Sequence, residues 1–383
     1  MHLWNRSAKG VTSPAGTRIV SERDGLERSG VRVNIRTDKA IAATTDTAVL
    51  HKKMLQLLSA LWVTHAIGAF ARLNLADAIE DGAGDLAAIA QLRNLNPDRV
   101  NRLLRALSTV GIVSETGPGH FAMTPLGGLL GSRAPQSMRT TAMLLTGYLG
   151  DMWGKLADAV AGDAVAFESM AGQPLFDWLA ERPDEAERFH RMMVEVHGPE
   201  TPAIIAAYDF AGFQHIVDIG GGNGALISAV LAAFPGRRAT LFDLPEAIAL
   251  ARRGEGGPLP GVTLCAGDVF KAVPAGGDAY LLRHVMHDFD DDDCGRILRN
   301  VRGAMAPEAR VLVLEAPVPH TPTPGPGRWL DLHMMLLANG RERSLDDYAR
   351  IFAGADLRLA RTLPTRHPAM TIIEAVAAPS RQA

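Results

Sequence analysis

HIVDIGGGNGALISAVLAAF, residues 215–234, joins an apolar strand to an apolar helix through a glycine-rich turn. Such a turn lets the backbone approach a ligand closely, and it is typical of nucleotide-binding α/β folds. The turn lacks the Gly-Lys-Ser/Thr of a Walker loop, and its glycines are spaced GxGxG rather than GxGxxG. Asp218 directly precedes the glycines, where a carboxylate would repel a pyrophosphate. The stretch therefore predicts a ligand with an ammonium group and not a dinucleotide.

Strands and helices alternate through the C-terminal part of the chain. After the strand at 215–219, apolar runs predict strands at 239–243, 262–265, 278–282 and 310–314, then a helix at 345–357 and strands at 358–363 and 371–376. This alternation predicts a mostly parallel sheet with helices on both faces. The predicted fold class is therefore α/β, with a Rossmann-like doubly wound sheet of seven strands.

Polar residues at the ends of the next two strands extend the predicted ligand site. Asp243 ends the second strand, 25 residues after Asp218, where an acid can accept hydrogen bonds from both ribose hydroxyls. Asp268 and Val269 follow the third strand, where they could hold an adenine by its amino group and one face. Together these residues predict a nucleoside with an amino-acid-like tail and no phosphates.

LLRHVMHDFDDDDCGRIL, residues 281–298, leaves the fourth strand and starts a helix. His287 follows the carboxyl end of that strand, where doubly wound sheets bind ligands, and an imidazole there can take a proton from a hydroxyl. The aspartates at 290–293 precede a helical apolar stripe and are expected to cap that helix. His284, His287 and Asp288 are suitable metal ligands by type. Adjacent positions leaving a strand seldom converge, however, so His284 is predicted to be structural and no metal site is predicted.

The region before the sheet is predicted to be mostly helical. Asn96 and Pro97 start a helix with an apolar stripe, and SETGPGHFAMT, residues 114–124, predicts a small hairpin. Helix, helix and hairpin form the pattern of a winged helix-turn-helix. This pattern leaves a DNA-binding regulator as an alternative, with its phosphate contacts at Arg99, Arg102 and Arg105.

The bulk composition of the 383 residues is typical of a soluble globular protein, and the net charge of −3 disfavours nucleic acid or an anionic membrane as partner. Two cysteines, Cys265 and Cys294, and the lack of a signal-like apolar run predict a cytoplasmic protein. The most apolar run, 57–70, is too short to cross a bilayer and is predicted to be a buried helix. Residues 1–44 are predicted to be a flexible arm.

Five segments carry a resemblance to a known family: MTPLGGLL (123–130), DIGGGNG, FDLP, GDVF and HVMHDFDDDDC. Their order and spacing resemble class I S-adenosylmethionine-dependent methyltransferases, and more narrowly the O-methyltransferases of plant phenylpropanoid and bacterial aromatic natural-product pathways. The resemblance covers about residues 50–378. It implies a homodimer that methylates a hydroxyl of a small, aromatic secondary metabolite. It also implies a winged-helix dimerisation domain at 45–135, a helical linker lining the substrate at 136–205, and a cofactor-binding catalytic domain at 206–383.

The same resemblance implies roles for individual residues. Cofactor contacts would fall on Asp218, Gly220, Gly222, Asp243, Leu244, Asp268, Val269 and Arg283. His287 would be the catalytic base, flanked by the acids Glu315 and Glu342, and substrate contacts would fall on Met335, Asn339 and Asp288. A relative that binds S-adenosylmethionine but catalyses hydroxylation or ring formation is the alternative within this fold. The presence of His287 argues against it.

Overall fold

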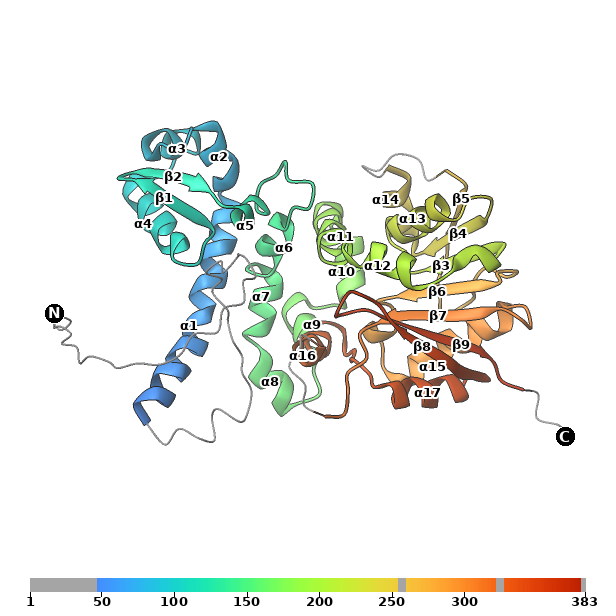
Figure 1. Cartoon of the computed structure of the whole chain (residues 1–383). Coiled ribbons are helices and arrows are strands. Elements are labelled where there is room, and N and C mark those ends of the chain that lie inside the picture. Colours follow the sequence, from blue (N-terminus) through green and yellow to red (C-terminus); the bar gives the residue numbers. More distant parts are fainter. Residues whose placement is uncertain (1–46, 254–259, 322–326, 380–383) are drawn as a thin grey trace, which may run out of the picture. The chain divides into compact units, whose positions relative to one another are not determined.

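The computed structural model describes residues 47–253, 260–321 and 327–379, so the predicted arm at 1–44 lies outside the described residues. The C-terminal part contains a seven-stranded sheet with the strand order β5-β4-β3-β6-β7-β9-β8 (Figure 1). The strands are β3 (His215–Ile219), β4 (Arg238–Asp243), β5 (Val262–Ala266), β6 (Ala279–Arg283), β7 (Arg310–Glu315), β8 (Leu357–Pro364) and β9 (Thr371–Ala377). Strands β3 to β7 are parallel, whereas β9 is antiparallel to both β7 and β8. The predicted doubly wound seven-stranded sheet is confirmed.

Helices cover both faces of this sheet because its central strands are apolar on both sides. Val217 and Ile219 of β3 pack on one face with α15 (Asp291–Ala304) and α17 (Leu345–Ala353). Ile216 of the same strand packs on the other face with α12 (Glu200–Ala207), α13 (Ala225–Ala233) and α14 (Pro245–Arg253). Two short 3-10 helices, η1 (Phe210–Gly212) and η2 (Met286–Asp288), complete this part. The two cores hold the strands firmly, so the loops at their carboxyl ends start from fixed positions.

The N-terminal part combines helices with a two-stranded hairpin. Its elements are α1 (Thr47–Arg72), α2 (Leu75–Asp81), α3 (Leu86–Leu92), α4 (Pro97–Ser108), β1 (Val113–Gly117), β2 (His120–Met123) and α5 (Pro125–Gly128). As predicted, Pro97 is the first residue of α4, and Asn96 caps this helix by accepting a hydrogen bond from the Arg99 N–H at 3.1 Å. Strands β1 and β2 are antiparallel, so the predicted hairpin is present. That the pattern is a winged helix-turn-helix remains a prediction.

Helix α1 is largely exposed, which corrects the prediction that residues 57–70 form a buried helix. Leu58, Leu61 and Trp62 are 65%, 59% and 75% exposed, and only three residues near the C-terminal end of the helix are buried. Among the described helices, α1 is also the one long and apolar enough to cross a membrane by length and composition alone. The prediction of a segment too short to cross a bilayer considered residues 57–70 alone, whereas α1 extends beyond both ends of that run. Apolar spacing predicts a helix but does not reveal what covers its faces.

A group of shorter helices lies between the hairpin and the sheet in sequence. These helices are α6 (Arg139–Leu144), α7 (Tyr148–Trp153), α8 (Leu156–Ala161), α9 (Ala166–Ala171), α10 (Leu175–Ala180) and α11 (Pro183–His197). They share a core with α16 (Gly327–Ala338), a helix that follows β7, and Leu149, Phe167 and Leu336 are buried in it. Helix α16 also contacts η2, the turn that carries His287. This packing places the region after β7 beside the predicted catalytic histidine.

Candidate active site

The glycine turn after β3 has a shape that only glycine accommodates easily. Gly220 and Gly222 have φ values of 66° and 59°, in the left-handed region. A Cβ on Gly220 would lie 2.7 Å from Cγ2 of Val285, whereas a Cβ on Gly222 would meet nothing within 4 Å. The turn is therefore packed on the Val285 side, while Gly222 borders open space in which a ligand could approach the backbone.

Asp218, just before this turn, carries a buried carboxylate without a partner. The residue is 1% exposed, and neither of its carboxylate oxygens accepts a hydrogen bond from the residues that the structure describes. Burial raises the pKa of Asp218 to about 7, although the positive charge of Arg283 opposes this effect. A buried, unpaired carboxylate is costly, and an ammonium group would satisfy it. The site therefore fits a ligand with an amino-acid-like tail.

The remaining predicted cofactor residues lie on neighbouring loops. The Asp243 carboxylate accepts hydrogen bonds from the N–H groups of Gly222 at 2.8 Å and Leu244 at 2.7 Å. Each carboxylate oxygen can accept two hydrogen bonds, so Asp243 keeps acceptor capacity for a ligand hydroxyl. Asp268 accepts from the Phe270 N–H at 2.9 Å, and the carbonyl of Val269, the next residue, accepts from the Asn300 side chain at 2.7 Å.

His287 and Glu342 form the closest pair of the site. His287 lies in η2, its Nδ1 is 2.7 Å from Glu342 Oε1, and the two residues are 6% and 8% exposed. Burial opposes a charge on His287, but the hydrogen bond to Glu342 and the negative charges of Asp288 and Glu315 outweigh it and raise the pKa of His287 to about 10. The carboxylate holds the imidazole by Nδ1 and leaves Nε2 as the atom that can exchange a proton. Asp288 Oδ1 lies 3.8 Å from this Nε2.

Glu315 contacts the backbone around His287 rather than its ring. Its Oε1 accepts hydrogen bonds from the N–H groups of Met286 at 2.8 Å and His287 at 3.1 Å, and its Oε2 accepts from the Tyr348 hydroxyl. Of the two acids predicted to flank the histidine, Glu342 orients the imidazole, and Glu315 fixes the turn that carries it.

Arg343 is a further residue of the site that sequence reasoning missed. It is 1% exposed, and its guanidinium donates to the carbonyls of Met286 and Phe289, each at 2.7 Å, and to Asp291 Oδ1 at 2.9 Å. This clamp ties the residue next to Glu342 to the backbone on both sides of His287. An arginine after an acid in the run RERS carries no periodic signal of burial, so the sequence offers no direct indication of this role.

The predicted substrate residues are not gathered at one point. Met335 is half-buried on α16 within the shared helical core, and Asp288 lies beside His287. Burial raises the pKa of Asp288 to about 6. Asn339 is exposed, directly after the end of α16, with a φ of 57°. Its contact with substrate stays a prediction.

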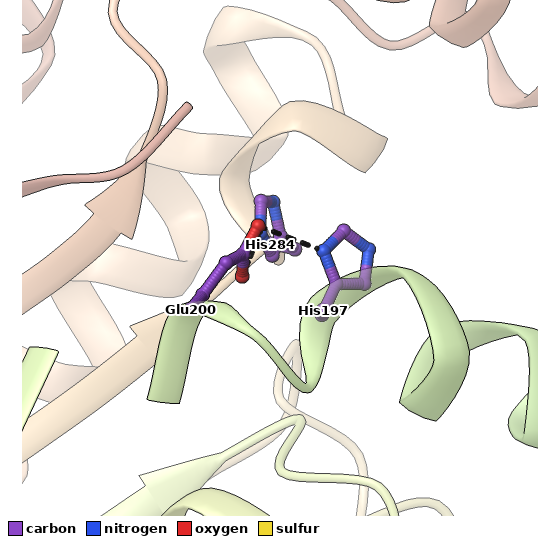
Figure 2. A group of neighbouring side chains, drawn as sticks. All are labelled: His197, Glu200 and His284. Atoms are coloured by element: carbon purple, nitrogen blue, oxygen red, sulfur yellow. Dashed lines mark hydrogen bonds and ion pairs between the residues drawn. The ribbon is translucent and has the colours of Figure 1, made fainter. Parts of the chain in front are cut away.

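His284 contacts two residues that sequence reasoning did not single out, Glu200 and His197 (Figure 2). Its Nε2 lies 3.0 Å from Glu200 Oε2, and His197 Nδ1 lies 3.1 Å from Glu200 Oε1. Burial lowers the pKa of His284 to about 3. Burial also raises the pKa of Glu200, but the hydrogen bonds to His197 and His284 and the charges of these two residues together lower it to about 2. The ring centroids of His284 and His287 lie 5.2 Å apart, but the donor atoms that lie within 4.8 Å of one another belong to His284, His197 and Glu200 rather than to the set of His284, His287 and Asp288. Glu200 instead holds the start of α12 against the end of β6, where Arg283 donates to Thr201 Oγ1 at 3.0 Å.

Comparisons with known proteins identify the family of the chain. A family model described as the O-methyltransferase domain matches residues 153–358, and one described as the O-methyltransferase dimerisation domain matches residues 55–133. The chain is 35% identical to phenazine O-methyltransferase PhzM of Lysobacter antibioticus over 84% of its length and 95% of that protein. It is 36% identical to 3-amino-4-hydroxybenzoate 4-O-methyltransferase of Streptomyces cremeus, over 85% of the chain and 90% of that protein. The crystal structure of NcsB1, an O-methyltransferase from neocarzinostatin biosynthesis, contains S-adenosyl-L-homocysteine and 1,4-dihydroxy-2-naphthoic acid. It matches with a TM-score of 0.73 and 29% identity, over 84% of this chain and 98% of that chain.

Proposed function

The chain belongs to the S-adenosylmethionine-dependent O-methyltransferases, and from this premise we propose that it methylates a hydroxyl group of a small aromatic secondary metabolite, with His287 as general base. The observation that carries the proposal is the buried pair of His287 and Glu342, whose Nδ1 and Oε1 atoms lie 2.7 Å apart. S-adenosylmethionine supplies an electrophilic methyl group on a positively charged sulfur. The protein must then position the acceptor oxygen and remove its proton.

His287 is suited to remove that proton from a phenol. Because Glu342 holds Nδ1, the Nε2 atom is free to accept the proton, and Glu342 stabilises the imidazolium that results. The pKa of His287, raised to about 10, is close to that of an ordinary phenol, so proton transfer between the two costs little free energy. The raised pKa also leaves His287 mostly protonated at neutral pH. Activity should therefore increase as the pH rises from 7 toward 10.

Asp218, Arg283 and the glycine turn are proposed to bind the amino-acid end of S-adenosylmethionine. The unpaired Asp218 carboxylate would accept the ammonium group, and Arg283 lies close enough to lower the pKa of Asp218 by its charge. Asp243 would accept the ribose hydroxyls, beside Leu244. Asp268 and Val269 would border the adenine. Met335 and Asp288 are proposed to contact the substrate.

The exposed apolar side of α1 supports a homodimer as the functional form. The dimerisation-domain match begins within α1, at residue 55, and runs to residue 133. Leu58, Leu61 and Trp62 present an apolar surface that the described residues of a single chain leave exposed. Burial of this surface against a second copy is the proposed role of the helix, in a cytoplasmic enzyme without a nucleic-acid or membrane partner.

The experiment that tests the function incubates the purified protein with radiolabelled S-adenosylmethionine and a panel of phenols. We expect methyl transfer by the wild type and a loss of turnover of about 10²- to 10⁴-fold in His287→Ala, with cofactor affinity retained in calorimetry. His320→Ala, which changes an exposed histidine in the loop after β7, is the matched control. Unchanged turnover in His287→Ala would remove this residue from the role of base. Cofactor binding without methylation of any phenol by the wild type would instead indicate a non-methylating relative.

A further inference from the structure

Trp153 and His333 form a hydrogen-bonded pair that the proposed mechanism does not use. The indole Nε1–H of Trp153, at the end of α7, donates to Nδ1 of His333 on α16 at 3.0 Å. The ring centroids lie 6.1 Å apart, and the ring planes are inclined by 27°. An indole nitrogen can only donate, so Nδ1 of His333 must be an unprotonated acceptor. The neutral imidazole therefore carries its single hydrogen on Nε2.

His333 keeps this form over the pH range in which the protein would work. Burial and the nearby positive charge of His287 lower the pKa of His333 to about 4. Protonation would also place two N–H donors against each other at the Trp153 bond. The result is an uncharged side chain whose Nε2–H makes no hydrogen bond within the described ranges, 47–253, 260–321 and 327–379.

The position of this donor is fixed relative to the proposed base. Helix α16 contacts η2, and Asp331, two residues before His333, accepts a hydrogen bond from the Glu342 N–H at 2.9 Å. The Arg341 N–H donates to the carbonyl of His287 at 2.9 Å. The segment that carries His333 is thus connected by hydrogen bonds to both members of the His287–Glu342 pair.

We propose that the Nε2–H of His333 donates a hydrogen bond to an acceptor atom on the aromatic substrate, and that this contact selects which hydroxyl faces His287. The inference rests on the proposed function and narrows its substrate class to phenols with a carboxylate, a carbonyl or a ring nitrogen beside the reacting hydroxyl. An unsubstituted phenol would leave the Nε2–H of His333 without a partner. Its kcat/KM should therefore be lower than that of an analogue that carries the acceptor. His333 is in this sense a specificity residue, and Trp153 is a positioning residue that holds its tautomer.

Matched substrate pairs test the proposal. 1-Hydroxy-2-naphthoic acid is compared with 1-naphthol, and 1-hydroxyphenazine with 1-hydroxyanthracene, in the wild type, His333→Phe, His333→Gln and Trp153→Phe. We expect His333→Phe to reduce kcat/KM for the acceptor-bearing member by roughly 10- to 100-fold and to leave the plain member within about twofold. His333→Gln retains an N–H donor and should restore part of the preference. Trp153→Phe removes the hydrogen bond that fixes the tautomer of His333. It should reduce kcat/KM for the acceptor-bearing member by less than His333→Phe does.

The product pattern separates recognition from a merely structural role. With 2,4-dihydroxybenzoate, in which only the 2-hydroxyl lies beside the carboxylate, the wild type should methylate the 2-hydroxyl in excess, and His333→Phe should form both monomethyl ethers. His320→Phe, at an exposed histidine, is the control and should behave as the wild type. Methylation without preference in any pair, or an equal loss for both members in His333→Phe, overturns the inference and leaves the proposed function standing. Failure to methylate any phenol would reject the proposed function and the inference with it.

Discussion

Replacement of Glu342 by glutamine perturbs the central pair of the site most directly. Glutamine keeps the size of the side chain and an acceptor oxygen for the Nδ1–H of His287, but it removes the negative charge. Burial alone would lower the pKa of His287, and the contact with Glu342 is the leading cause of its rise to about 10. The pKa of His287 should therefore fall in Glu342→Gln, and the neutral base should be populated at lower pH.

The size of this shift follows from the hydrogen bond that is weakened. A hydrogen bond to a charged group contributes about 1.5–3 kcal/mol, and one pKa unit corresponds to about 1.36 kcal/mol. The rising limb of kcat/KM against pH should move about one to two pH units toward acid. The imidazolium formed in the transition state loses the same stabilisation, so the plateau at high pH should fall by about 10- to 150-fold.

The assay measures kcat/KM between about pH 6 and 11 with one phenol that the wild type methylates. Asp346→Asn is the matched control, because it removes an exposed carboxylate four residues away. Calorimetric binding of S-adenosylmethionine and thermal unfolding of each variant show whether the fold is intact. A limb that stays in place, or that moves toward alkaline pH, would refute the assignment of Glu342 as the group that raises the proton affinity of His287.

Two further predictions concern the cofactor and the dimer. Burial raises the pKa of Asp218 from 3.8 to about 7. The ionised carboxylate therefore destabilises the folded protein increasingly as the pH rises from 3.8 to 7, and by its full amount above 7. Asp218→Asn should raise Tm without cofactor at pH 8 and weaken S-adenosylmethionine binding by calorimetry. A fall in Tm, or an unchanged cofactor affinity, would contradict the reasoning. Trp62→Asp, on the exposed side of α1, should convert a dimer into a monomer in light scattering, while Arg99→Asp on α4 should not.

Most of the fold could be predicted from the sequence because its signals are local. Alternation of apolar runs and turn residues marks each strand, and the helix after His287 begins at the predicted aspartates, where Asp290 caps it by accepting from the Asp293 N–H at 2.9 Å. The burial of α1 was predicted wrongly because a helix face has the same apolar spacing whether its own chain or another covers it. Local pattern cannot distinguish the two cases.

The site could be predicted in part. Resemblance points to His287 and Glu342, but only the folded chain shows that Glu342 holds the ring while Glu315 holds the backbone, because both acids are distant in sequence from the histidine. The Trp153–His333 pair joins residues 180 positions apart, and neither has a neighbour that marks it as polar and buried. Such pairs arise from packing between elements, which no spacing within one element encodes.

The Arg343 clamp has a consequence for how such a protein can change over evolutionary time. Because its guanidinium joins the backbone on both sides of His287 to the residue beside Glu342, the base and its carboxylate move as one unit. Trp153 on α7 and His333 on α16, which are proposed to select the substrate, are not among the hydrogen-bond partners of Arg343 in the described part of the chain. Substitutions there can redirect the enzyme to a new acceptor while proton abstraction is inherited unchanged, so recognition and chemistry can diverge at separate rates on one scaffold.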